Sequence, residues 1–121
     1  MKNKPARRER YLRDPLPIRL GGIAANLARV VSCADNVLNH RAVKDMLYES
    51  KLFIEWAAPS APADTAVVML ELQRAIVRWE RCWTQTPTPS TVPEDIIPFA
   101  RQWSDRLIEM SGLLEETPTL A

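Results

Sequence analysis

The chain has 121 residues, of which 46% are hydrophobic and 26% are charged. This size and balance are typical of one globular domain with a single core, and they exclude a disordered or membrane-embedded chain. No apolar run approaches the roughly 18 residues that a membrane-spanning helix requires. The basic start has no apolar stretch behind it that would form a secretory signal. We therefore expect one soluble domain in the cytoplasm, without a membrane partner.

The formal net charge of +1 hides an uneven distribution. Residues 1–13 form a basic arm, in which Glu9 is opposed by six basic residues: Lys2, Lys4, Arg7, Arg8, Arg10 and Arg13. The rest of the chain is mildly acidic. We expect the arm to be a flexible, solvated tail. The alternative is that its charge contacts an anionic partner such as nucleic acid.

The first helix is predicted over 15–36. Asp14 is a good N-cap, and Pro15 stands at the first helical position, where a missing N–H costs nothing. Apolar residues then recur at spacings of four and three, which lines one face of a helix. They are Leu16, Leu20, Ile23, Leu27, Val30 and Ala34. Gly21 and Gly22 interrupt this row at up to about 1 kcal/mol each relative to Ala, so we expect a neighbouring helix to approach them closely.

The next two helices are predicted over 39–58 and 61–83. Asn39 can cap the earlier helix, and Pro59 forbids its continuation. Ser60 is the expected cap of the later helix, in which Glu71 can pair with Arg74. The expected core rows are Val43, Leu47, Ser50, Ile54 and Ala57, and then Val68, Met69, Leu72, Ile76, Trp79 and Trp83.

A fourth helix is predicted over 95–112, after a proline-rich loop. Asp95 is the expected N-cap, and Gly112 resembles a helix C-cap. The core row of this helix is Ile96, Ala100, Trp103, Leu107, Met110 and Leu114.

Short connections force helices of this length to run antiparallel to their neighbours in the chain. We therefore predict an all-α domain over 14–114, folded as an antiparallel, up-down-up-down four-helix bundle, with a frayed tail over 115–121. The residues expected to be nearly buried are Leu27, Leu47, Ile54, Leu72, Ile76, Trp79, Trp103 and Leu107.

The residue patterns that mark an enzyme or a metal site are missing from the sequence. Bundle di-iron proteins use Glu-x-x-His pairs, which do not occur here. His40 is the one histidine, and a surface or capping role is favoured over catalysis. Cys33 and Cys82 lie far apart without zinc-ligand spacing, so we expect buried free thiols. We predict no catalytic residue, no metal and no cofactor.

Two polar rows are candidate binding surfaces. Arg74, Arg78 and Arg81 lie one above another on the third helix, near Trp79 and Trp83. This arginine row is a candidate for contact with an anion or nucleic acid by charge and stacking, or else an ordinary solvated face.

The second row lies on the first helix and consists of Gly21, Gly22, Asn26 and Arg29, continued by Cys33. A polar row beside an apolar one is typical of a subunit interface, of a small ligand cleft or of the flank of a bundle. We take it as the candidate surface for self-association.

Two runs of the sequence carry a resemblance. They are RDPLPIRLGGIAANLAR, from Arg13 to Arg29, and ESKLFIEW, from Glu49 to Trp56. Together with the residues between them they resemble small uncharacterised helical proteins of cyanobacterial type, over residues 13–56. The resemblance implies a cytosolic bacterial setting and supplies no catalytic residues.

Three functions follow from these patterns, in order of preference. The first is a non-enzymatic helical interaction or assembly module, with a protein partner or a second copy of itself. The alternative is a nucleic-acid-associated accessory subunit that uses the basic arm and the arginine row. A bundle enzyme with an unrecognised site comes third.

Overall fold

The structure, a computed structural model, describes residues 4–34, 39–84 and 96–112. Within these ranges the chain is helical and contains no strand, so the prediction of an all-helical chain is confirmed. The elements are α1 (Lys4–Arg13), α2 (Leu16–Cys33), α3 (His40–Ala57), the short 3₁₀ helix η2 (Ala58–Ser60), α4 (Ala63–Thr84) and α5 (Ile96–Ser111). Each of the four longer helices begins and ends within three residues of its predicted bounds.

The start of α2 differs from the prediction by one residue. Pro15, rather than Asp14, occupies the N-cap, and Pro17 lies in the first turn. Asp14 directly follows the last residue of α1 instead, and its N–H donates to the Tyr11 carbonyl at 3.2 Å. Asn39 is the N-cap residue of α3, as predicted, but its side chain makes no capping hydrogen bond.

The other helix ends agree only in part with the predicted capping residues. Ser60 lies in η2 instead of capping α4, and the Ala66 N–H donates to the Pro62 carbonyl at 2.8 Å in the first turn of α4. Gly112 ends α5 with a φ of +73°, a left-handed conformation that glycine adopts without strain. The C-cap predicted there is confirmed, whereas Asp95 and Leu113 lie outside the described residues.

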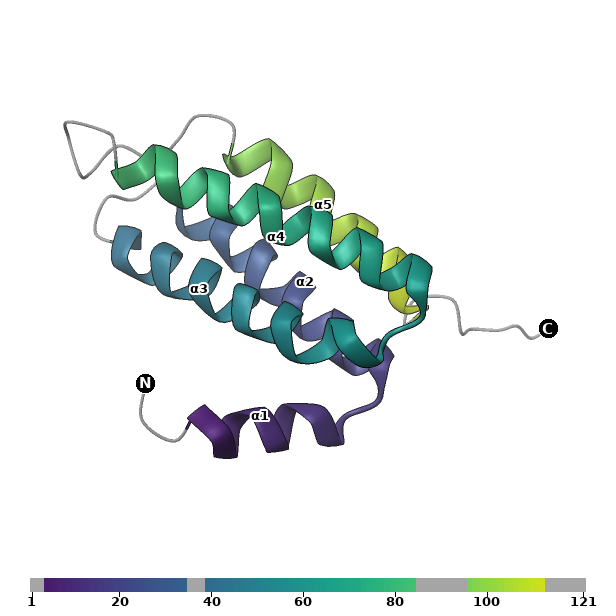
Figure 1. Cartoon of the computed structure of the whole chain (residues 1–121). Coiled ribbons are helices and arrows are strands. Elements are labelled where there is room, and N and C mark those ends of the chain that lie inside the picture. Colours follow the sequence, from purple (N-terminus) through teal and green to yellow (C-terminus); the bar gives the residue numbers. More distant parts are fainter. Residues whose placement is uncertain (1–3, 35–38, 85–95, 113–121) are drawn as a thin grey trace.

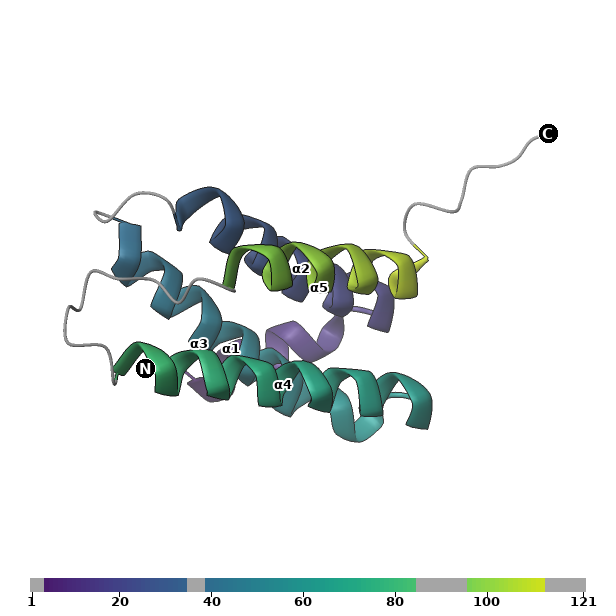
Figure 2. The same cartoon turned by 90° about the horizontal axis from the view of Figure 1, so that it is seen from above.

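The four longer helices lie side by side in both views, with their axes roughly aligned (Figures 1 and 2). Helix α2 makes the most extensive contacts, with α5 and with α3. Helix α4 contacts α3 and, more sparsely, α5. Figure 2 shows α2 beside α5 and α3 beside α4, so the core lies between these two pairs.

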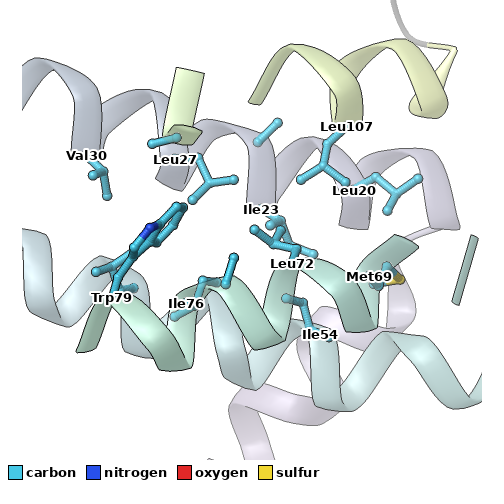
Figure 3. Packing of buried hydrophobic residues seen from close by; sticks show 14 of the residues in the cluster. Leu20, Ile23, Leu27, Val30, Ile54, Met69, Leu72, Ile76, Trp79 and Leu107 are labelled. Atoms are coloured by element: carbon cyan, nitrogen blue, oxygen red, sulfur yellow. The ribbon is translucent and has the colours of Figure 1, made fainter. Parts of the chain in front are cut away.

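The core draws on all four longer helices. Side chains of α2 and α4, among them Leu27 and Trp79, point toward one another (Figure 3). The largest fully buried side chains are Leu20, Ile23, Leu27, Leu47, Ile54, Met69, Leu72, Ile76, Trp79, Ile96 and Leu107. Seven of the eight residues predicted to be nearly buried are therefore buried. Trp103 is half-buried instead, because its ring lies at the edge of the core, 4.9 Å from the Arg106 guanidinium carbon.

The N-terminal arm is not the flexible tail that its composition predicted. Residues Lys4–Arg13 form α1, which lies outside the group of four helices and contacts α3 (Figure 1). The arm contains Tyr11, which packs against the edge of the core, and Arg7, which pairs with Glu49 of α3. A ten-residue helix is marginal in water by itself, so these contacts stabilise α1.

Expectations about His40 and the two cysteines hold only in part. His40 is 9% exposed, so it is buried at the start of α3 and not on the surface, while the capping role stays a prediction. Cys82 is exposed and Cys33 is half-buried, and no disulfide joins them. Cys82 lies near the end of α4, beyond Trp79, the last residue of that helix that is described as buried.

Truncation of a buried leucine of the core should destabilise the fold. Leu27 and Leu107 are both 0% exposed, so Leu27→Ala and Leu107→Ala should each lower the free energy of unfolding by about 2–5 kcal/mol. Urea denaturation followed by circular dichroism measures the change. Ile18→Ala is the matched control, because Ile18 is 46% exposed and its loss should cost about 0.5 kcal/mol or less. Equal midpoints for all three variants would contradict this core.

Candidate interaction surface

Helix α4 carries two rows of side chains on opposite sides. The inner row, which includes Leu72, Ile76 and Trp79, is buried in the core. The outer row consists of Ala63, Val67, Leu70, Arg74, Val77 and Arg81, and all six residues are exposed. Its spacings are 4, 3, 4, 3 and 4, the same spacings that align the core rows of the other helices.

Three large apolar residues on the outer row face the solvent. Val67 is 56% exposed, Leu70 50% and Val77 40%. Single exposed apolar residues are normal on any protein surface, but these three share one face of one helix. They span ten residues, which is about 15 Å along a helix axis. An apolar face of this length is typical of a helix that receives another helix.

Shallow grooves run beside the outer row. One has a volume of 430 Å³ and is lined by Leu70, Gln73, Arg74 and Val77. A second, of 310 Å³, lies between α4 and the end of α3 and shares Leu70 and Gln73 with the first. Glu55 also lines this second groove. The outer row is therefore flanked by hollows that a side chain from another molecule can fill.

Polar contacts join α4 to the helices on both of its sides. Toward α3, Lys51 Nζ lies 2.7 Å from Glu80 Oε1, and Gln73 Nε2 donates to the Lys51 carbonyl at 3.4 Å. Toward α5, Glu71 Oε1 lies 3.7 Å from Arg106 Nη1. Glu71 therefore pairs with Arg106 rather than with Arg74, the partner predicted from the sequence.

The predicted arginine row overlaps the outer row. Arg74, Arg78 and Arg81 are all exposed. Trp79 is only 1% exposed, so its ring is not open to stack on a base. The side chain of Trp83 lies outside the described residues. The structure thus offers the charge of the predicted anion site but not the stacking surface of Trp79.

The basic residues of the arm are divided by α1 between two environments. Arg8, Arg10 and Arg13 are exposed, whereas Arg7 turns toward α3 and donates to Glu49 Oε2. Lys2 and the side chain of Lys4 lie outside the described residues.

The candidate interface on α2 takes part in a polar network inside the chain. Asn26 is 2% exposed, and its Nδ2 donates to Glu49 Oε1 at 3.1 Å. Arg29 Nη1 donates to Asn26 Oδ1 at 2.9 Å. Together with Arg7, these residues connect α1, α2 and α3. The network satisfies a buried amide, which would otherwise cost about 1–3 kcal/mol.

The two glycines of that row have ordinary surroundings. A Cβ at Gly22 would meet Phe53 Cε2 at 3.9 Å, a normal contact distance, so no backbone approaches it so closely that glycine is required. Gly21 is half-buried. Gly22 and Asn26 thus face their own chain, Gly21 and Arg29 remain partly or fully accessible, and self-association through this row stays a prediction.

An aromatic cluster and one arginine hold α1 in place. The rings of Tyr11 and Phe53 are stacked, with centroids 4.2 Å apart. The ring centroid of Trp56 lies 5.9 Å from that of Tyr11. The Tyr11 hydroxyl donates to the Arg19 carbonyl at 3.0 Å. Arg19 Nη2 donates to the Leu12 carbonyl at 3.0 Å. Burial raises the pKa of the Tyr11 hydroxyl above its ordinary value of about 10, because the ionised form would be poorly hydrated there.

Comparison of the chain with protein families, curated proteins and solved structures found no match. In the part of the chain that the structure describes, no group of three His, Cys, Asp or Glu side chains is placed to hold a metal ion. None of the described helices is both long and apolar enough to cross a membrane.

Val67, Leu70 and Val77 were not among the candidate residues chosen from the sequence. The signal was present, because their spacing with Arg74 repeats the pattern of a core row. It was hidden because α4 has apolar residues on both of its sides, so the sequence offers two candidate inner rows. Packing against α2 and α3 decides between them.

The aromatic cluster generates a prediction about α1. Tyr11→Ala should lower the free energy that holds α1 against α3 by about 1.5–3 kcal/mol, because it removes both ring burial and stacking. Hydrogen exchange measures this as faster exchange of the α1 amides, with the α5 amides unchanged. Arg13→Ala is the control, since Arg13 is exposed on the same helix. Equal α1 exchange in the two variants would contradict the role of Tyr11.

Proposed function

We propose that the chain is a non-enzymatic interaction module that binds a protein partner through the outer row of α4. The observation that carries this proposal is the exposure of Val67, Leu70 and Val77 on one face of a helix whose opposite face is buried. A helix that packs on both faces, one inside its own chain and one outside, is a common way to build a helical assembly.

The size of the apolar row sets the expected strength of binding. Covering three half-exposed side chains contributes about 1 kcal/mol each. Association costs several kcal/mol in translational and rotational freedom. The apolar row alone is therefore insufficient, and polar contacts around it must contribute. Arg74, between Leu70 and Val77 on the row, is the residue best placed to do so.

The proposal includes the predicted arrangement of the four longer helices as an antiparallel, up-down-up-down bundle, in a bacterial cytoplasm. The arrangement is supported by the short connection between α3 and α4, in which η2 is followed by two residues, and by the contacts of α2 with both α3 and α5. A short connection makes two consecutive helices run in opposite directions. The bacterial setting rests on the resemblance of residues 13–56.

In-cell photo-crosslinking tests the interaction. A photoreactive residue placed at Val67 should give defined protein adducts in the native host, because Val67 would lie inside the interface. The same residue at Arg101, exposed on α5, should not give them. Leu70→Ser should abolish the Val67 adducts without unfolding the chain, since Leu70 is 50% exposed. A Val67 probe without specific adducts would contradict the proposal.

A second candidate function is favoured by the position of α1. Because α1 is a helix held on one side by α3, Arg8, Arg10 and Arg13 are presented on an ordered element rather than on a loose tail. Exposed arginines on a helix are typical contacts for phosphate groups of nucleic acid. An accessory subunit bound to nucleic acid is therefore the alternative function.

Substitution tests this alternative better than deletion, because removing α1 would also uncover Phe53 and Trp56. The triple variant Arg8→Ala, Arg10→Ala, Arg13→Ala should weaken binding to duplex DNA if the alternative holds. The slope of log affinity against log salt should fall by about 0.9 for each phosphate that the variant no longer neutralises. Fluorescence anisotropy across a salt series measures it. Equal affinity and slope for the variant and the original chain would remove the alternative.

A further inference from the structure

We infer that the partner on the outer row of α4 is an amphipathic helix whose apolar face is bordered by acidic side chains. This inference rests on the proposed function and adds the chemistry of the partner. It is carried by three observations: an apolar row, two arginines without a salt bridge to a described carboxylate, and a groove of 430 Å³ that Arg74 lines together with Leu70 and Val77.

The second half of α4 carries positive charge on the outer row and beside it. Arg74 lies on the row between Leu70 and Val77, and Arg78 follows one helical turn later. Neither makes a salt bridge to a described carboxylate, and the acidic residues near them in the sequence, Glu71 and Glu80, pair with Arg106 and Lys51. An acidic partner would satisfy both guanidinium groups.

Arginine suits this position on an apolar row. The side chain of Arg74 lines the groove with Leu70 and Val77, so its aliphatic part can be covered by the partner while its guanidinium stays at the edge. A carboxylate at that edge forms a charge-assisted, bidentate hydrogen bond with arginine. Binding then combines apolar burial with a directional contact, which the apolar row alone does not supply.

The charges also fix where the acidic residues of the partner must lie. Glu55 lines the groove at the Leu70 end, between α4 and α3, so a carboxylate there would be repelled. Arg74 and Arg78 lie on the other side of Leu70. The partner therefore places its acidic residues opposite the second half of α4. The apolar contacts from Val67 to Val77 span about 15 Å, so its helix needs at least three turns.

A second copy of the chain fits the row less well. Parallel pairing of two α4 helices would place Arg74 against Arg74 and Arg81 against Arg81. Antiparallel pairing in the register that matches Leu70 with Val77 would bring the two copies of Arg74 together at the symmetry axis. Both arrangements set like charges side by side within an interface, which is unfavourable. A carboxylate-bearing partner removes this repulsion.

Binding of two synthetic peptides to the full-length chain tests the inference. Both peptides are amphipathic helices with the same leucine row, but one carries glutamate and the other lysine beside that row. The glutamate peptide should bind at least about tenfold more tightly, with an affinity that falls as salt is added. Arg74→Glu should reverse the preference, Leu70→Ser should weaken both peptides, and Arg101→Glu should change neither.

Other outcomes would contradict either the acidic helix as partner or the proposed function itself. Equal affinity for both peptides, or no binding of either at about 1 mM, would overturn the acidic helix as partner. A dimer in light scattering that Leu70→Ser dissociates would identify a second copy as the occupant and would also overturn it. Adducts at Val67 in cells would in those cases still support the proposed function, whereas their absence would defeat the proposed function itself.

Discussion

Burial of the apolar row of α2 is the interaction on which the other helices depend. Leu20, Ile23 and Leu27 are at most 2% exposed, and α2 contacts both α3 and α5. Ser104 Oγ of α5 also donates to the Ala24 carbonyl of α2, at 3.0 Å. Removal of these side chains from water is the main favourable term in folding. Helix α2 thereby sets the rotation of its neighbours, and α4 closes the core from the other side.

The exposed face of α4 follows from the way in which α4 covers the core. Helix α4 offers two rows with the same spacing, and the core takes the row that contains Trp79 and Leu72, because larger side chains bury more apolar area. Val67, Leu70 and Val77 are left facing the solvent. The packing of the core and the exposure of the outer row therefore have the same cause.

Two polar residues of α2 differ in exposure, since Asn26 is buried and Arg29 is exposed. Asn26 and Arg29 resemble surface residues in the sequence, yet they join Glu49 and Arg7 in one network. The network and the stacking of Tyr11 on Phe53 turn a strongly basic segment into helix α1. Arg8, Arg10 and Arg13 of α1 remain exposed.

The sequence by itself did not predict α1, but it determined the approximate bounds of the four longer helices and predicted seven of the eight expected core residues correctly. It could do so because a spacing of four and three places apolar residues on one helical face, and because proline and glycine mark helix ends through local geometry. Tertiary structure alone decided which row of α4 faces outward, the docking of α1, and the inward turn of Asn26. These outcomes depend on contacts between residues far apart in the chain, such as Arg7 with Glu49 and Tyr11 with Phe53, and no local pattern encodes them.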